Sequence, residues 1–339
     1  MNKKLLAMAV GVAVLAPGMA LADVSIYGRA HVSLDQLDDG GDYNETNLSS
    51  NSSRLGFRGD TKIADSNLTA FFQVETEINF AQGKGSSWAS RDTFVGLKGD
   101  FGMVRAGQFD SPFKAARDPA NLFGDQLGDM RNLTRVGDAR FDERTPNTIH
   151  YQTPNYNGLQ FNLGYSIHEG TAAKDDEKQD AVSASVTYAN GPFQGALAYE
   201  QYGRDTSNGK RKAVRLAGAY KVADPVKLVA FYQNANHDDD QFDSDTWGLG
   251  AEFQVAPATY VKGMYMMMDA DAKDMSADMV AVGVEHRLDK ALRVYANYAI
   301  VMNDDLAALT PWQQARTTNV GGAAGENAQG LSLGMRYDF

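Results

Sequence analysis

Basic side chains occupy the polar faces of several stretches in which apolar and polar residues alternate. In SSRLGFRGD, Leu55 and Phe57 share one face of an extended chain, and Arg54 and Arg58 share the other. Arg29 has the same kind of position in VSIYGRAHVSL. Guanidinium groups bind carboxylates and small anions through paired hydrogen bonds. These arginines therefore indicate an interior surface that handles ions, although each could equally be a solvated residue or part of a structural ion pair.

The histidines carry no catalytic signature. Five of them stand at positions 31, 150, 168, 237 and 286, without a Gly-x-Ser-x-Gly elbow or another local catalytic pattern. In NTIHYQTP, Ile149 and Tyr151 face one way, which leaves His150 on the side of the arginines. The acidic runs at 238–245 and 269–274 lack the glycine and glutamate spacing of a calcium loop. The sequence predicts no enzyme, no metal site and no cofactor.

The elements that must position these side chains are strands. About sixteen alternating stretches begin near residues 23, 52, 67, 89, 102, 146, 159, 180, 192, 212, 226, 245, 259, 278, 292 and 329. Short connections such as PNYNG and ANGP follow the even-numbered stretches, and longer polar ones such as DDGGDYNETNLSS follow the odd-numbered ones. This order predicts an all-β, antiparallel up-and-down barrel with the long loops at one end and both termini at the other.

Composition places this barrel in a membrane. Gly is abundant at 33 residues, Tyr and Phe number 15 and 16, and Cys is absent. After residue 22 no segment approaches the ~18 uninterrupted apolar residues of a transmembrane helix, and closed barrels are the folds that place alternating strands in a bilayer. A soluble propeller or sandwich is the alternative, but no blade repeat or domain boundary supports it. The excess of 43 acidic over 32 basic residues argues against nucleic acid as a partner.

Both ends of the chain fit this interpretation. Residues 1–22 combine a basic head, an apolar run and Ala20-Leu21-Ala22, the pattern of a secretory signal peptide. Its removal would take the basic residues from 32 to 30 against 43 acidic ones, a net charge near −13, and would leave one barrel domain at 23–339. The stretch LSLGMRYDF alternates up to Phe339, so we expect the last strand to pair on both edges, which prevents fraying.

One connection is too long for a simple loop. About 35 residues separate Asp110 from the next strand near Thr145. Ser111 and Pro112 predict the N-cap and first turn of a short helix at 112–117. Five apolar residues in this segment need burial, which the lumen of a sixteen-strand barrel offers: Leu122, Phe123, Leu127, Met130 and Leu133. An external lid is the alternative.

The motifs RDTFVGLKGDFGMVRAGQFDSPF and TPNTIHYQTPNYNGLQF, together with the terminal strand, resemble the trimeric general-diffusion porins of proteobacterial (Gram-negative) outer membranes. The resemblance covers the whole chain. It implies an outer-membrane channel for passive diffusion of small hydrophilic solutes, a homotrimer, and a third loop folded inward as the constriction. It also implies that Phe339 is part of the signal for the barrel-assembly machinery. A substrate-specific channel, a barrel enzyme and an adhesin remain as alternatives.

The resemblance further implies that wall arginines oppose acids of the inward loop. The constriction would then contain Arg54, Arg58, Arg91, Asp125, Asp129, Arg144 and His150, the last at a position where related porins often have arginine. These charges nearly balance, so we expect weak ion selectivity, leaning towards cations through the external acids. We also expect this selectivity to change as His150 gains a proton near its ordinary pKa of ~6.5.

Two expectations concern the outside of the barrel. The small outward residues Gly28 and Ala30 predict a close protein contact, and therefore a trimer interface at the first strands. The acidic external loops lie where lipopolysaccharide is expected, and they could share divalent cations with it.

Overall fold

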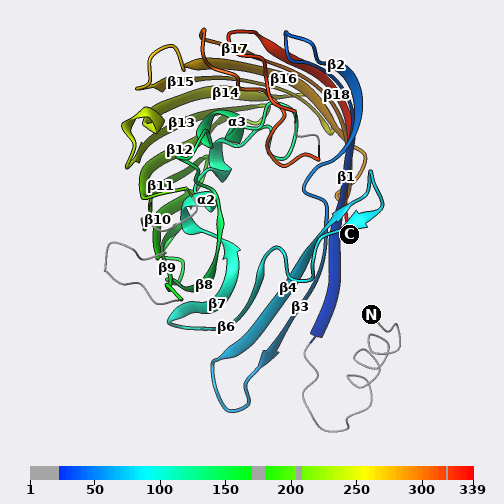
Figure 1. Cartoon of the computed structure of the whole chain (residues 1–339). Helices are drawn as coiled ribbons and strands as arrows, with labels where there is room; N and C mark the ends of the chain where they lie inside the picture. Colours follow the sequence, from blue (N-terminus) through cyan, green and yellow to red (C-terminus); the bar gives the residue numbers. More distant parts are fainter. Residues whose placement is uncertain (1–22, 170–179, 204–207, 318–319) are drawn as a thin grey trace.

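One antiparallel sheet of 18 strand elements closes on itself in the computed structural model (Figure 1). The structure describes residues 23–169, 180–203, 208–317 and 320–339, so the expected signal peptide lies outside the described residues. The first strands are β1 (Asp23–Asp38), β2 (Asn44–Ser50), β3 (Arg54–Lys62), β4 (Thr69–Asn79), β5 (Lys84–Gly85), β6 (Thr93–Gly99), β7 (Gly102–Asp110), β8 (Arg144–Gln152) and β9 (Leu159–Ser166). The others are β10 (Ala181–Asn190), β11 (Phe193–Tyr202), β12 (Arg211–Ala223), β13 (Val226–His237), β14 (Ser244–Ala256), β15 (Thr259–Ala270), β16 (Ala277–Arg287), β17 (Leu292–Asn303) and β18 (Ala328–Asp338).

These 18 elements form a wall of 16 strands. β2 and β3 both pair with β1, at residues 32–38 and 23–29 respectively, so together they act as one wall strand. β5 is a two-residue piece that pairs with the end of β4 and adds no further strand to the wall. The expected count of sixteen is confirmed, but the expected long loop DDGGDYNETNLSS is wrong in part, because its second half is β2, which continues the wall upward.

The ends of the chain close the barrel. β1 and β18 are antiparallel partners, with Arg29 opposite Asp338 and Asp38 opposite Gln329. The last residue takes part in this ladder, because the N–H of Phe339 donates to the carbonyl of Gly28 at 3.0 Å and its carbonyl accepts from the Gly28 N–H at 2.8 Å. Both edges of the terminal strand are therefore paired, as the alternation predicted.

The outer face of the wall is apolar. Side chains such as Ile26 and Leu249, exposed by 65% and 67%, alternate with inward polar ones. Exposed aromatic residues lie near both rims, with Tyr188 and Phe193 at the short-turn end and Trp247 towards the long-loop end. An apolar belt with aromatic residues at both edges matches the thickness and interfaces of a bilayer.

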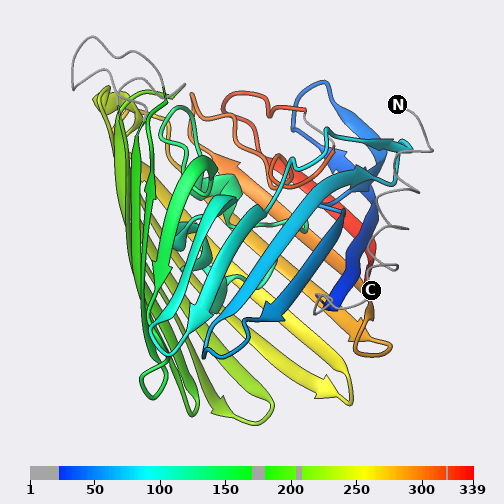
Figure 2. The same cartoon turned by 90° about the horizontal axis from the view of Figure 1, so that it is seen from below.

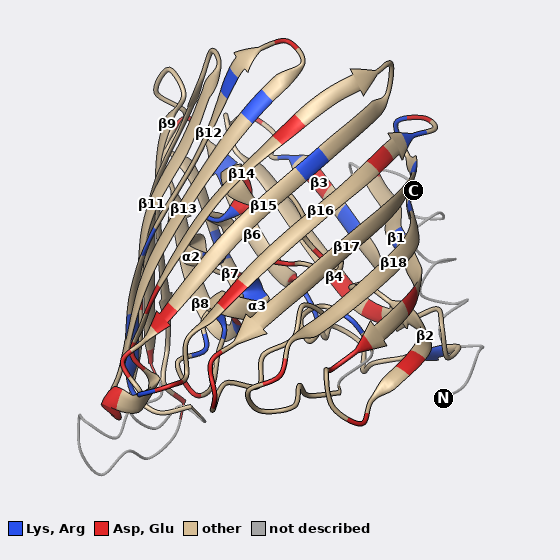
Figure 3. Cartoon of the chain, turned by 90° about the horizontal axis from the view of Figure 1, so that it is seen from above, with Lys and Arg blue, Asp and Glu red and all other residues tan. Residues whose placement is uncertain are grey.

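The two ends of the barrel differ. Tight turns join the strands at one end, while longer loops and η3 (Asp240–Phe242) lie at the other (Figure 2). Many of the acidic residues gather at the long-loop end (Figure 3). Within the described ranges, no helix has the length and apolar character needed to cross a membrane.

The main hydrophobic cluster lies inside the barrel. The long β7–β8 connection, residues 111–143, folds inward and is called loop 3 here. Its expected apolar anchors are all buried: Leu122, Phe123, Leu127, Met130 and Leu133. They pack against inward apolar residues of β12–β17, among them Met264, Met266 and Met268 of β15. Burial of this apolar area stabilises the inward position of the loop.

The β17–β18 connection also folds inward. Trp312 is fully buried, and the carbonyl of Pro311 accepts a hydrogen bond from the N–H of Gly128 in loop 3 at 2.8 Å. Arg316 forms a buried ion pair with Asp35 of β1. The sequence indicates only a long connection between the last two strands here, and the structure adds that Trp312 and Arg316 have their partners inside the barrel.

Candidate functional site

Loop 3 begins with a short capped helix. The Ser111 hydroxyl accepts a hydrogen bond from the N–H of Lys114 at 3.1 Å, and Pro112 is the first residue of α2 (Pro112–Ala115). The helix ends two residues earlier than expected, and the 3-10 helix η1 (Asp118–Ala120) follows it. A second short helix, α3 (Arg131–Thr134), lies further along the loop. These turns set the directions of the loop's charged side chains.

A buried triad of charges fastens both ends of loop 3 to the wall. Asp142, near the end of the loop, pairs with Arg215 of β12 at 2.5 Å and with Arg117, near its start, at 3.0 Å. Arg215 is fully buried, and it also donates to the carbonyl of Phe113 at 3.0 Å. Burial alone would raise the pKa of Asp142, but the Arg215 and Arg117 guanidinium groups hold it below its ordinary value. The carboxylate is therefore ionised and acts as a structural anchor.

The tip of loop 3 presents one carboxylate to the lumen and keeps another behind it. Asp125 pairs with Arg29 of the wall at 3.2 Å and with Arg131 at 2.9 Å. Asp129 is fully buried, where it pairs with Arg131 at 2.6 Å and accepts the N–H of Asp125 at 2.7 Å. Burial would raise the pKa of Asp125, yet Arg131 and Arg29 keep it below its ordinary value. Asp129 thus orders the tip, while Asp125 remains a partly exposed, largely neutralised charge.

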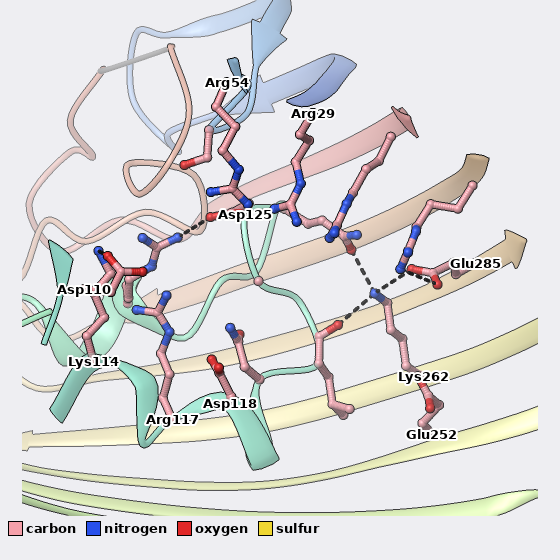
Figure 4. Close-up of a pocket in the computed structure, with 18 of the residues that line it drawn as sticks. Arg29, Arg54, Asp110, Lys114, Arg117, Asp118, Asp125, Glu252, Lys262 and Glu285 are labelled. Atoms are coloured by element: carbon pink, nitrogen blue, oxygen red, sulfur yellow. Dashed lines mark hydrogen bonds and ion pairs between the residues drawn. The ribbon is translucent and has the colours of Figure 1, made fainter. Parts of the chain in front are cut away.

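The opposite wall holds the loop through Lys262 of β15. Its ammonium group donates to the carbonyl of Leu122 and to the side-chain oxygen of Gln126, both at 2.8 Å, as Figure 4 shows. The same oxygen of Gln126 accepts from Asn297 of β17 at 2.8 Å. Gly128 then brings the loop against the wall with a φ of +84°, and a Cβ there would lie 2.5 Å from that of Ala281. The loop is therefore fixed on two sides of the lumen.

A cavity of ≈ 420 Å³ lies beside loop 3 and is lined mostly by charged groups (Figure 4). Six basic side chains come from β1, β3, the β5–β6 connection and loop 3: Arg29, Arg54, Arg91, Lys114, Arg117 and Arg131. Six more come from β8 and β13–β18: Arg144, Lys227, Lys262, Arg287, Arg293 and Arg336. The acidic side chains in the described lining number five: Asp110, Asp118, Asp125, Glu252 and Glu285.

Four residues expected at the constriction line this cavity. Arg91 is buried and pairs with Glu75 at 2.6 Å, while Arg54 lies 3.8 Å from the same carboxylate. Arg144 pairs with Asp92 at 2.5 Å and with Asp110 at 2.8 Å. Asp125 lines the same cavity from the tip of loop 3 and lies near Arg54 and Arg29 (Figure 4). The structure thus brings wall arginines and one loop acid to a common space.

Three other expected residues lie outside the cavity lining. Arg58 is nearer the short-turn end of β3, where its guanidinium covers the ring of Tyr27 at 4.8 Å. Asp129 is buried behind Asp125, as described above. His150 does point inward, but it is buried.

The partners of His150 explain its distance from the solute path. Its Nδ1 accepts a hydrogen bond from Arg105 at 3.0 Å, its Nε2 lies 3.3 Å from Asn162, and its ring contacts Phe109. A proton switch at His150 therefore lacks the direct exposure to passing ions that the sequence-based expectation assumed.

The near balance of charge expected from the sequence stays a prediction. The lining itself has 12 basic and five acidic side chains, but five further acids pair with these bases from outside the lining: Glu75, Asp92, Asp129, Asp142 and Asp338. The basic residues of the lining that were not expected from the sequence include Arg287, Arg293 and Arg336. Their inward positions follow from the same strand alternation that revealed Arg54, so the signal was present in the sequence. The directions of Lys114, Arg117 and Arg131 depend on how loop 3 folds, and alternation carries no information about them.

Comparison with known proteins gives consistent results. A family model described as Gram-negative porin matches residues 7–306. The chain is 31% identical over 360 aligned residues to outer membrane porin protein 32 of Delftia acidovorans, with all of both chains covered.

Solved structures show the same architecture. The anion-selective porin from Comamonas acidovorans superposes with a TM-score of 0.80 at 26% identity, covering 94% of this chain and 100% of that one. A trimer form of OmpT from Vibrio cholerae has a TM-score of 0.68 at 19% identity, covering 94% and 99%. The latter likeness concerns the fold alone.

Proposed function

Because this chain belongs to the Gram-negative porin family and forms a diffusion channel in the outer membrane, we propose that its pore favours anions. The observation that carries this proposal is that 12 basic and five acidic side chains line the cavity at loop 3, while other acids that pair with these bases, such as Glu75 and Asp92, lie outside the lining. Charges at a narrow, poorly solvated site act through a lower effective dielectric than charges at an open rim. The basic groups of the cavity therefore affect passing ions more strongly than the acidic external loops do, even though the whole chain has a net charge of −11.

The proposed constriction consists of Arg29, Arg54, Arg91 and Arg144 on the wall, with Asp125 on loop 3. Asp125 neutralises part of Arg29 and Arg131, so it tempers the positive potential rather than reversing it. The solved porin of Comamonas acidovorans is described as anion-selective, which supports the same assignment for this chain. The proposal includes no catalytic step, because these groups stand in ion pairs and not as a nucleophile with an oriented base.

A substrate-specific sugar channel is the main alternative, and it would need exposed aromatic residues for stacking. Phe109, Phe113 and Phe123 are each exposed by at most 1%, since they pack loop 3 against the wall. The described lining of the cavity has Leu122 as its sole large apolar side chain. These observations favour general diffusion of hydrated solutes.

Swelling of liposomes that contain the purified protein tests this choice. With neutral sugars of increasing size, we expect the swelling rate to fall smoothly, because a polar lumen selects by size. A single sugar that enters far faster than smaller ones would contradict general diffusion and support the specific channel.

We also propose that the chain assembles as a homotrimer in contact with lipid and lipopolysaccharide. The likeness to porins, including one solved in a trimer form, supports this. Gly28 supports a trimer interface less than expected, because the ring of Phe339 covers it within the same chain. A Cβ on Gly28 would lie 2.5 Å from that ring. Light scattering of the protein in mild detergent should give three times the monomer mass, and a monomer mass would count against the trimer.

Phe339 remains our proposed signal for the barrel-assembly machinery. Its ring is 47% exposed on the outer face, where another protein can reach it before the barrel closes. Deletion of Phe339 should lower the yield in the outer membrane, and an unchanged yield would mean that the residue serves closure alone.

A further inference from the structure

Three arginines form a row across adjacent strands at the short-turn end of the pore. Arg287 is the cross-strand partner of Arg293, and Arg293 is the partner of Arg336. All three line the cavity described above. Arg287 is the last residue of β16, while Arg293 and Arg336 lie within three residues of the ends of β17 and β18. We call these three residues the arginine row.

Such a row is unfavourable without an anion. Like charges directly opposite one another on neighbouring strands destabilise a sheet. Two carboxylates lie among the arginines, and both are shared. Glu285 is 2.9 Å from Arg287, 3.6 Å from Arg293 and 3.8 Å from Lys262.

The second carboxylate, that of Asp338, is also shared by several basic side chains. Asp338 lies 2.8 Å from Arg336, 2.8 Å from Arg29 and 3.7 Å from Arg293. Five cations therefore share these two acids, although one of them, Arg29, also pairs with Asp125 of loop 3. Arg293, the middle residue, has contacts of 3.6 Å and 3.7 Å, which are long for charge-assisted hydrogen bonds.

Arg293 also has unused hydrogen-bonding capacity. Its Nε is buried and has no hydrogen-bond partner among the described residues. Its side chain is still 23% exposed, so the guanidinium reaches the cavity. A buried donor normally has a hydrogen-bond partner, because an unsatisfied one destabilises the fold.

We propose that the arginine row is a binding site for multivalent oxyanions at the periplasmic exit of the pore. This inference rests on the proposed anion preference and assigns one part of the same cavity, its short-turn end, to bound anions. Neighbouring strands are ~4.8 Å apart, so three arginines on β16, β17 and β18 span roughly 10 Å. That length suits a linear anion with two or three charged groups, such as a short phosphate chain, better than a monovalent ion.

The row would act in sequence with the arginines at loop 3. An anion that leaves Arg54 and Arg29 meets the row next, and Arg29 borders both groups because its partner Asp338 also contacts Arg336. Conduction through a selective pore requires several sites, each favourable enough to enter and weak enough to leave. The shared carboxylates Glu285 and Asp338 weaken the row in this sense, because they compete with the passing anion.

Block of chloride current by tripolyphosphate tests the inference. The intact protein in a planar bilayer receives tripolyphosphate on one side and then on the other, and the concentration that halves the chloride conductance is measured. We expect block from the short-turn side at lower concentration than from the long-loop side. Arg293→Gln should raise the half-blocking concentration from the short-turn side by about tenfold, the effect of losing one charged contact.

Matched variants distinguish the effect of the positive charge of Arg293 from the effect of its planar guanidinium geometry. Arg293→Lys keeps the charge but loses the planar fork, so we expect an intermediate effect. Lys221→Gln removes a basic side chain near the same rim but outside this cavity, and it should leave the block unchanged. Citrate in place of tripolyphosphate shows whether carboxylate oxyanions bind as well. If Arg293→Gln fails to fold, Arg336→Gln serves the same purpose.

The outcomes distinguish this inference from the proposed function. If the wild-type pore prefers chloride but Arg293→Gln and Arg336→Gln are blocked like the wild type, the site does not exist and the anion preference stands. A wild-type pore that prefers potassium would overturn the proposed function itself, whatever tripolyphosphate does.

Discussion

At the scale of single residues, burial decides what each charge does. Arg215 and Asp142 are almost fully buried and hold each other, so they fix the loop and do not meet solutes. Arg54 has the same chemistry but is 20% exposed at the cavity, where its nearest acid is 3.8 Å away. Exposure and incomplete pairing therefore separate the side chains that act on ions from those that act on structure.

Lys114 leads to a prediction about pH. Burial lowers its pKa to about 8, against the effect of Asp110, whose carboxylate lies 2.9 Å away. The residue loses its positive charge as the pH rises through this value, which makes the cavity less positive. We therefore expect the anion preference, measured as the zero-current potential in a KCl gradient, to decrease between pH 7 and pH 9.

Two variants test the origin of this change. Lys114→Arg keeps its charge throughout the range, because the arginine pKa is above ~12, so it should reduce the decrease. His150→Gln should leave the profile as it is, since His150 lies outside the cavity lining. The assignment to Lys114 fails if Lys114→Arg follows the wild-type profile, or if His150→Gln removes the decrease.

At the scale of elements, loop 3 acts as one clamped unit. The triad of Arg117, Asp142 and Arg215 joins its ends to β12, and Lys262 of β15 holds its middle. Apolar anchors such as Phe123 and Leu127 fill the space between these points. Because the clamps lie on different wall strands, the loop depends on the closed barrel for its position.

Removal of one clamp should loosen the loop. Arg215→Met leaves Asp142 buried with Arg117 as its remaining guanidinium partner, and breaking a buried charge pair typically costs ~3–5 kcal/mol. We expect a lower midpoint of urea unfolding and larger fluctuations of single-channel current. Lys212→Met is the matched control, because Lys212 is exposed on the same strand. Equal midpoints and equal noise in both variants would show that the triad does not hold the loop.

At the scale of the whole molecule, alternation and loop length were sufficient to predict the barrel. The expected strand starts agree with the structure within a few residues, and the closure of β1 on β18 is confirmed. The inward position of loop 3 also followed from its apolar anchors. β2 was missed, because NETNLSS has a single apolar residue, Leu48, and so lacks the alternation that marks the other strands.

Other features could have been found with the same reasoning. The run MYMMM in β15 is apolar on both faces, which indicates that something packs inside the barrel against Met264, Met266 and Met268. The inward fold of the β17–β18 connection, in contrast, could not have been predicted from the sequence. Arg316 pairs with Asp35, which lies 281 positions earlier in the chain (316 − 35), and no local pattern encodes a contact of that range.

The chain as a whole is acidic, whereas basic side chains predominate in the lining of the cavity at loop 3. The chain has a net charge of −11, and many of its acidic residues lie at the long-loop end (Figure 3). Salt screens exposed charges over ~8 Å at physiological ionic strength. The cavity, with 12 basic and five acidic groups, should therefore control which ions pass.

The zero-current potential across a planar bilayer in a KCl gradient at pH 7 tests this central claim most directly. The account predicts a potential with the sign of chloride permeation, which persists at high salt and grows in Asp125→Asn, because that change releases Arg29 and Arg131 from their shared acid. A potential with the sign of potassium permeation, or none at all, would contradict it.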